Sequence, residues 1–107
     1  MSEISHVSES DFQDEVLGFP QPVLVDFTAV WCGPCKMLDP VVKQLAQDWT
    51  GKVKVVKLDV DHNPNLAIQY QVMGVPTLML FKAGQPIERV TGDQPKDRLE
   101  KKFNQHF

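Results

Sequence analysis

The 107-residue sequence has only two cysteines and three histidines, the residue types that most often bind structural zinc. Such a zinc site needs four ligands, usually arranged as two closely spaced pairs. Cys32 and Cys35 form one pair, but His6, His62 and His106 are scattered and form no second pair. The same ligand count argues against an iron–sulfur cluster, so we expect no bound metal.

Long apolar runs and clusters of positive charge are also absent. No stretch approaches the roughly 20 apolar residues of a membrane span. The formal net charge is −3, and the sequence contains no basic patch, since the Lys101-Lys102 pair is better explained as a solvated helix end. These absences argue against a membrane or a nucleic acid as partner. With 42% hydrophobic residues in a chain of this length, we expect one globular domain over residues 1–107. We also expect a monomer, although composition does not determine the oligomeric state.

The N-terminal segment lacks the features of a secretory signal. Residues 1–10 begin with Met and contain neither a positively charged start nor an apolar stretch. We therefore expect a cytoplasmic protein in a reducing compartment. Disulfides in such compartments are usually transient or catalytic.

The cysteine pair lies in the string Trp31-Cys32-Gly33-Pro34-Cys35. A disulfide between cysteines this close would restrict the unfolded chain very little, because its loop is so short. A structural crosslink is therefore disfavoured. A C-x-x-C pair near a strand–helix–strand pattern is typical of a reactive dithiol.

Apolar periodicity predicts alternating strands and helices. Strands are predicted at residues 23–30, 53–60, 77–81 and 87–91, and helices at residues 8–18, 34–49, 63–70 and 95–103. Ser8 is the predicted N-cap of the first helix, and residues 83–86 are predicted to form a turn. The strand–helix–strand pattern over residues 23–60 predicts a parallel strand pair with a right-handed crossover. The predicted fold class is α/β, with a central mixed sheet and helices on both faces.

The two cysteines are predicted to have different roles. Cys32 lies where a strand ends and a helix begins, and the free N–H groups and dipole of a first helical turn stabilise negative charge. We therefore predict that Cys32 is the nucleophile, with a lowered pKa. Cys35 lies one turn into the helix, points inward and is the predicted resolving thiol. Gly33 and Pro34 make the turn tight, and Pro34 suits a first helical position.

Asp26 is a carboxylic acid within an otherwise apolar strand. Burial would raise its pKa, although an outward-facing Asp on a solvated sheet face is the alternative. We hypothesise that Asp26 takes the proton from Cys35 during the resolving step. Lys57 in the neighbouring strand is either within reach of Asp26 or a solvated strand residue.

Two further features accompany the dithiol. Trp31 either provides an exposed apolar surface for a partner or packs in the core. The segment Gly74-Val75-Pro76-Thr77 places a proline just before a buried strand. This proline has either a cis peptide bond in a special turn or a trans bond at a strand start.

Together these residues resemble the thioredoxin family. The matching residues are Asp26, Phe27, Ala29, Trp31-Cys32-Gly33-Pro34-Cys35-Lys36, Pro40, residues 57–61, Gly74-Val75-Pro76-Thr77, Phe81-Lys82, Gly84 and Gly92. They cover essentially the whole chain, and the W-C-G-P-C string is far more specific than a bare C-x-x-C.

The resemblance implies a fold and an activity. The fold would be the thioredoxin fold, a mixed sheet of four or five strands flanked by four helices. The activity would be general reduction of disulfide-containing proteins through a redox-active Cys32–Cys35 disulfide. No cofactor would be bound, and a thioredoxin reductase would supply the electrons for cell redox homeostasis.

The resemblance also implies roles for individual residues. It makes Cys32 the nucleophile, Cys35 the resolving thiol and Asp26 the buried acid. It makes Pro76 cis and places it against the dithiol, with the Val75 backbone pairing with an extended substrate segment. The implied partner surface consists of Trp31, Gly33, Pro34, Gly74, Val75, Pro76 and Gly92.

Two positions depart from the family pattern. Many members carry an aromatic residue where this chain has Thr28, and its loss would loosen packing beside the dithiol and affect the reduction potential. Met73 is also unusual before the Gly-Val-Pro segment, where the partner surface would differ.

Two other functions remain open at this stage. A disulfide oxidant or isomerase of the same fold often has His before its second cysteine, so Pro34 favours a reductant. A binding module without turnover would need none of Cys32, Cys35, Asp26 and Pro76.

Overall fold

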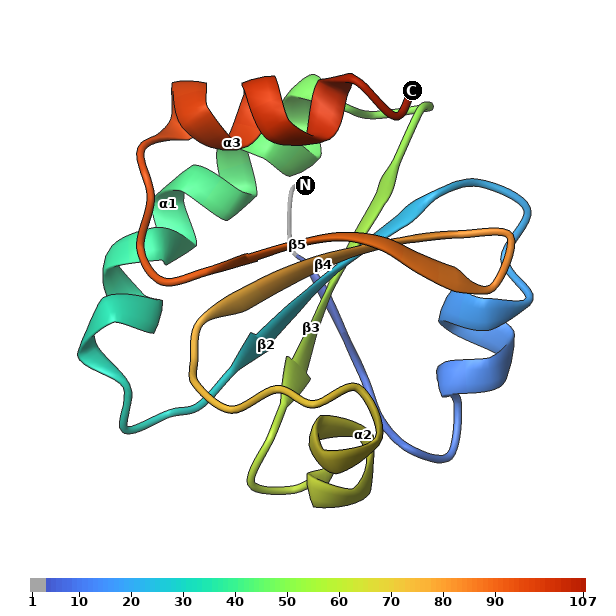
Figure 1. Ribbon diagram of the computed structural model, residues 1–107, viewed down its shortest axis with the longest axis vertical. Helices are drawn as coiled ribbons and strands as arrows, with labels where there is room; N and C mark the ends of the chain where they lie inside the picture. Colours follow the sequence, from blue (N-terminus) through green and yellow to red (C-terminus); the bar gives the residue numbers. More distant parts are fainter. Residues whose placement is uncertain (1–3) are drawn as a thin grey trace.

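The computed structural model describes residues 4–107 and has a five-stranded sheet between two layers of helices (Figure 1). Residues 1–3, the start of the segment without a predicted signal, lie outside the described residues. The elements in chain order are β1 (Ser5–Val7), the short π-helix η1 (Gln13–Leu17), β2 (Val23–Thr28), α1 (Gly33–Asp48), β3 (Lys54–Asp59), α2 (Pro64–Gln69), β4 (Thr77–Lys82), β5 (Gln85–Thr91) and α3 (Lys96–Asn104). In the described part of the chain, none of the helices has the length and apolar character needed to cross a bilayer.

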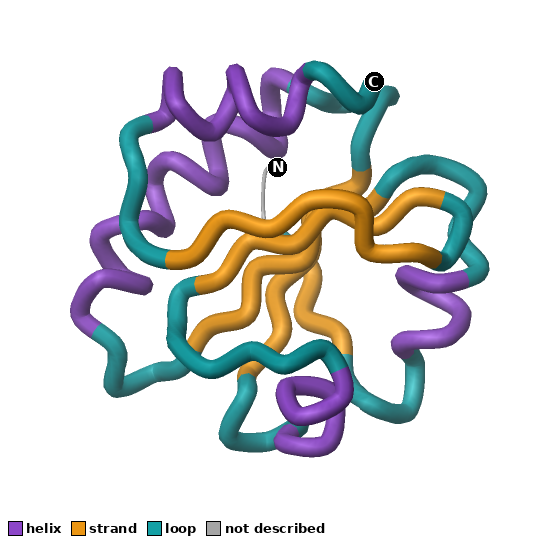
Figure 2. The backbone as a smooth tube through the Cα atoms, viewed as in Figure 1, coloured by secondary structure: helices purple, strands orange, loops and turns teal. Residues whose placement is uncertain are grey.

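The strand order in the sheet is β1-β3-β2-β4-β5. Strands β1 and β2 run parallel to β3, whereas β4 is antiparallel to both β2 and β5. The parallel pairing of β2 with β3 across α1 confirms the predicted strand–helix–strand unit. In this register Asp26 lies opposite Lys57 of β3 and opposite Leu78 of β4. The mixed sheet with helices on both faces confirms the predicted fold class (Figure 2).

Strand β2 is the centre of the sheet and is buried on both faces. Because successive strand side chains point to opposite faces, Val25 and Phe27 pack on the side of η1 and α2. Leu24 packs on the opposite side, beneath α1 and α3. Figure 1 shows α1 and α3 together on one side of the sheet, with α2 and the first helix on the other. Asp26 alternates with Val25 and therefore faces α1.

Helix α1 positions the cysteine pair over the sheet. Its N-cap is Cys32, and Leu38, Val42 and Leu45 recur at helical spacing and are fully buried against the sheet. Burial of each such side chain stabilises the fold by about 1.5–3 kcal/mol. The helix continues through Pro40 to Asp48, so it spans nearly the predicted range.

The hairpin between β4 and β5 is tighter than the predicted turn. Ala83 and Gly84 both have positive φ angles, as in a two-residue type I′ turn, so pairing resumes at Gln85. Pro86 therefore belongs to β5, where the edge position tolerates its missing N–H.

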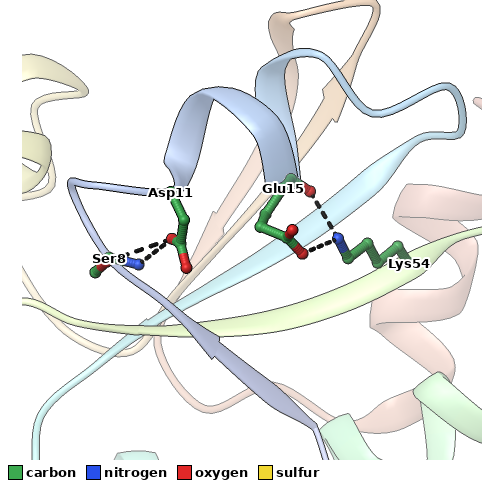
Figure 3. A network of polar contacts seen from close by, with 4 residues as sticks. All are labelled: Ser8, Asp11, Glu15 and Lys54. Atoms are coloured by element: carbon green, nitrogen blue, oxygen red, sulfur yellow. Dashed lines mark hydrogen bonds and ion pairs between the residues drawn. The ribbon is translucent and has the colours of Figure 1, made fainter.

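The N-terminal part of the chain departs most from the sequence prediction. Strand β1 was not predicted, because it has three residues and only Val7 is buried. The first helix is confined to residues 13–17, and Ser8 belongs to a preceding turn in which its N–H donates to the Asp11 carboxylate at 2.7 Å. Figure 3 shows how the Lys54 ammonium joins this helix to β3, by contacting the carbonyl and the carboxylate of Glu15 at 3.0 and 2.7 Å.

Candidate active site

Cys32 and Cys35 are joined by a disulfide at the start of α1, with their Cα atoms 5.3 Å apart. Cys32 has extended backbone angles and caps the helix, because its sulfur accepts a hydrogen bond from the Cys35 N–H at 3.1 Å. Pro34 occupies the first helical turn, where its missing N–H costs nothing. Both cysteines are only 3% exposed.

This arrangement treats the two sulfurs differently. The Cys32 sulfur sits at the positive end of α1 and receives an N–H, an environment that stabilises a thiolate. Cys35 lies within the helix, and the structure places it at the wall of a cavity that is partly open to solvent. Gly33 has open space around its Cα, so the surface at the disulfide is uncrowded there.

A second loop, the one before β4, lies against the disulfide. The Val75–Pro76 peptide bond is cis, as the family resemblance implied. The Val75 carbonyl oxygen is 3.7 Å from the Cys32 sulfur. These two groups are close in space although they are 43 positions apart in the sequence. Gly92, with φ 97°, donates its N–H to the Pro76 carbonyl at 2.8 Å. The Thr77 hydroxyl closes the loop by donating to the Gly74 carbonyl at 2.7 Å.

Asp26 is buried, with 1% of its surface exposed, which rules out the alternative of a solvated strand residue. Its Oδ1 atom has no hydrogen-bond partner among residues 4–107. Burial raises the pKa of Asp26 to about 7; the positive charge of Lys57 opposes this rise, and the negative charge of Asp39 adds to it. Asp26 can therefore exchange a proton near neutral pH.

Lys57 lies opposite Asp26 in the sheet register and lowers the pKa of Asp26, as the within-reach interpretation expected. Its side chain is only 13% exposed, so it is not a solvated strand residue. Its ammonium donates a hydrogen bond to the Asp39 carboxylate at 2.5 Å. The register brings Lys57 opposite Asp26, but α1 supplies the competing partner.

A cavity of about 240 Å³ lies beside the resolving cysteine. It is lined by His6, Thr28, Ala29, Val30, Cys35, Lys36, Asp39, Lys57 and Asp59. Thr28, the position where many family members carry an aromatic residue, is one of its walls. Cys35 itself packs against Ala29 and Val75, and Thr28 shares the cavity with the charged Lys36, Asp39, Lys57 and Asp59.

Apolar side chains form an exposed surface around the disulfide. Trp31 is 68% exposed, not packed in the core, and its indole N–H donates to the Asp61 carboxylate at 2.7 Å. A groove of about 280 Å³ runs from Trp31 past Ile68 and Met73 to Val75. Met73 is 95% exposed, so the position noted as unusual lies fully on this surface. Exposed apolar surface of this kind is typical of a protein-binding site.

Sequence reasoning missed three residues of this region. Asp39 follows Cys35 by one helical turn, and that spacing was the available signal. Asp61 lies in the stretch 57–61 that resembles the family, but the sequence does not show that Asp61 and Ile68 lie beside Trp31, because their place there depends on the loop after β3 and on α2.

The described residues contain no group of three or more His, Cys, Asp or Glu side chains arranged to hold a metal ion. The site consists of a disulfide at a helix N-terminus, a cis-proline loop against it and a buried acid on the adjoining strand.

Comparison with known proteins identifies the same family that the sequence resembles. A family model for thioredoxin matches residues 3–105. This chain belongs to the thioredoxin family. It is similar to thioredoxin 1 of Nostoc sp. (49% identity over all of both chains) and to thioredoxin of Synechocystis sp. (52% identity over 92% of each chain). It is also similar to thioredoxin of Staphylococcus aureus, with 50% identity over 97% of this chain and 98% of the relative.

Family membership and the site agree on the chemistry. The five-stranded sheet with four helices is the thioredoxin fold, and the bonded Cys32–Cys35 pair is its redox-active disulfide. The chain is therefore a thiol-disulfide oxidoreductase that reduces protein disulfides.

Proposed function

We propose that Cys32 attacks substrate disulfides and that Cys35 then releases the substrate. The observation that carries this assignment is the N–H···S hydrogen bond from Cys35 to the capping sulfur of Cys32. It stabilises charge on the Cys32 sulfur, whereas Cys35 lies deeper in the helix.

The reaction transfers two electrons to the substrate in two exchanges. The Cys32 thiolate attacks one substrate sulfur, the substrate S–S bond breaks, and the leaving thiolate takes a proton from solvent. Cys35 then loses its proton and attacks the Cys32 sulfur. That step breaks the mixed disulfide, releases the second substrate thiol and forms the Cys32–Cys35 disulfide.

Asp26 is the proposed acceptor of the Cys35 proton. It shares the α1-facing side of the sheet with Lys57, and Lys57 lines the same cavity as Cys35. A carboxyl whose pKa is raised to about 7 is a base matched to neutral pH. Asp26→Asn should slow release of the mixed disulfide in a single-turnover experiment while leaving its formation unchanged. An unaltered release rate would sink the assignment.

The proposed substrates are disulfide-containing proteins in the cytoplasm, and a thioredoxin reductase restores the dithiol. The groove from Trp31 to Val75 suits an extended apolar segment, with the Val75 backbone available for main-chain pairing. Gly33, Pro34, Gly74, Pro76 and Gly92 complete the proposed surface. We propose that the chain works as a single domain and a monomer, without a bound cofactor.

Reduction of insulin by dithiothreitol tests the function directly. We expect a rate well above the dithiothreitol background for the native chain and no gain for Cys32→Ser. Cys35→Ser should accumulate a mixed disulfide with insulin that mass spectrometry detects on Cys32. A native rate equal to the background would instead indicate a binding module on the same scaffold.

A further inference from the structure

Three charged residues lie close together where α1 packs on the sheet: Asp26 of β2, Lys57 of β3 and Asp39 of α1. Asp26 and Lys57 lie opposite each other on adjacent parallel strands and face the same side of the sheet. Asp26 is nevertheless buried with an Oδ1 atom that has no partner in residues 4–107. The cation placed to bind it, the Lys57 ammonium, contacts Asp39 at 2.5 Å instead.

Asp39 is well placed to capture this cation. It follows Cys35 by four residues on α1, so the two side chains lie on the same side of the helix. Asp39, Lys57 and Cys35 line one cavity. The Asp39 carboxylate is about one-third exposed, whereas Asp26 is not, so an ammonium bound to Asp39 keeps access to solvent. Full burial of an ion pair would cost more desolvation free energy than this arrangement.

We propose that Asp39 is a positioning residue that holds the Lys57 ammonium away from the Asp26 carboxyl. The proposal rests on the proposed role of Asp26 as the proton acceptor for Cys35. In this proposal Asp39, a residue of α1, sets how strongly the Asp26 carboxyl binds its proton.

Among the charged groups around Lys57, Asp39 is the carboxylate that its ammonium contacts. The other charged or titratable side chains facing this cavity or the one beside it are His6 of β1, Lys36 and Lys43 of α1, and Asp59 of β3. The Asp59 carboxylate is occupied by the N–H groups of Asp61 and His62. On β4 the neighbour of Asp26 is Leu78, and α3 contributes apolar Leu99 and Phe103 to this side of the core.

The direction of the effect follows from the signs of the charges. Lys57 lowers the pKa of Asp26, and Asp39 raises it. Replacing Asp39 by Asn removes a negative charge and frees Lys57 to approach Asp26, and both changes lower the pKa of Asp26. A carboxyl with a lower pKa is a weaker base. The acid limb of the release step should therefore move to lower pH, and the plateau rate should fall.

The test measures the Asp26 carboxyl without turnover. In the oxidised full chain with ¹³C-labelled aspartate, we expect Asp39→Asn to move the titration midpoint of Asp26 downward by roughly one pH unit. The control is Asp48→Asn, which removes another α1 carboxylate that is paired with a lysine, Lys96, and that is remote from the cavity. This control should leave the Asp26 midpoint in place.

A double-mutant cycle separates positioning of Lys57 from a direct effect of charge. In a Lys57→Met chain, Asp39→Asn should move the Asp26 midpoint by less than half as much. Lys57→Gln replaces Lys57→Met if the latter does not unfold cooperatively. The proposal is overturned if Asp39→Asn leaves the Asp26 midpoint unchanged, or if its effect is equal with and without Lys57.

A kinetic readout keeps this inference distinct from the proposed function. If Asp39→Asn shifts the Asp26 midpoint but Asp26→Asn does not slow substrate release, the positioning by Asp39 stands and the role of Asp26 as proton acceptor fails. If Asp26→Asn slows release but Asp39→Asn leaves the Asp26 midpoint in place, the proposed function stands and the positioning by Asp39 fails.

Discussion

The Cys35 N–H donates a hydrogen bond to the Cys32 sulfur at 3.1 Å, so the second cysteine of the pair stabilises charge on the first. The bond exists because Cys32 is the N-cap of α1 and Cys35 lies within its first turn. A side chain in this position satisfies one of the free N–H groups that every helix has at its start. The helix that positions the dithiol thus also makes its two sulfurs unequal.

The reduced chain should accordingly have a Cys32 thiol more acidic than an ordinary one. In a Cys35→Ser chain, the alkylation rate with iodoacetamide should rise with a midpoint below about 8.5, the pKa of a free thiol. In the matched Cys32→Ser chain, Cys35 should react more slowly at neutral pH, because it lies within the helix and not at the N-cap position that receives a free helix N–H. A Cys32 midpoint at or above about 8.5 contradicts the thiolate stabilisation.

Asp26 should make the free energy of unfolding depend on pH. Its carboxyl titrates at about 7 in the folded chain and near 3.8 when it is not perturbed. Between these values the folded state binds more protons, so the free energy of unfolding falls as pH rises from about 4 to about 7. We expect Asp26→Asn to raise it at pH 8 by up to about 4 kcal/mol, and by little at pH 4.

Urea unfolding at pH 4, 6 and 8 measures this difference. Asp93→Asn is the control, because the Asp93 side chain is exposed and should leave the pH dependence of the native chain unchanged. An Asp26→Asn gain of equal size at pH 4 and pH 8 would show that burial of the charged carboxylate is not its cause.

Trp31 should contribute to substrate binding and little to stability. Its ring is 68% exposed at one end of the apolar groove. Trp31→Ala should lower kcat/KM for insulin by about tenfold, mainly through KM, because large aromatic residues dominate such surfaces. Its effect on the free energy of unfolding should stay within about 0.5 kcal/mol.

Two variants sharpen this test of Trp31. Trp31→Phe should retain most of kcat/KM because it keeps an apolar ring, although it loses the hydrogen bond to Asp61. Ile87→Ala changes a partly exposed apolar residue on β5, outside the groove, and should have no effect on kcat/KM. Native kcat/KM for Trp31→Ala would exclude Trp31 from the substrate surface.

The reduction potential distinguishes a reductant from an oxidant of the same fold. We expect equilibration with glutathione to give a value near −270 mV, the potential of thioredoxin itself, with about 30 mV equal to about 1.4 kcal/mol. A value near −120 mV would identify an oxidant. The cavity walled by Thr28 beside Cys35 is the feature of this chain that would account for a deviation.

Much of the active site could be predicted because the residues around the dithiol are neighbours in the sequence. The spacing of Cys32 and Cys35, with Pro34 between them, places both at the start of one helix. Helix capping joins residues two or three apart, so it can be recognised without knowledge of the fold. The apolar run around Asp26 likewise predicted a buried strand, and burial alone indicates the direction of its pKa shift.

The rest of the site required the tertiary structure. The Val75 carbonyl reaches the Cys32 sulfur only because β2 and β4 are antiparallel neighbours, so the start of α1 and the loop before β4 meet at the same end of the sheet. Strand β1 adds three residues whose partner, β3, lies about fifty positions away. Two carboxylates lie near the Lys57 ammonium, Asp26 on the sheet and Asp39 on α1, and the sequence does not show which of them it contacts. Sequence alone identified the reactive pair and placed Asp26 within an apolar strand. Packing between distant segments decided that Asp26 is buried and that Lys57 contacts Asp39, because desolvation and distance act only once α1 lies on the sheet.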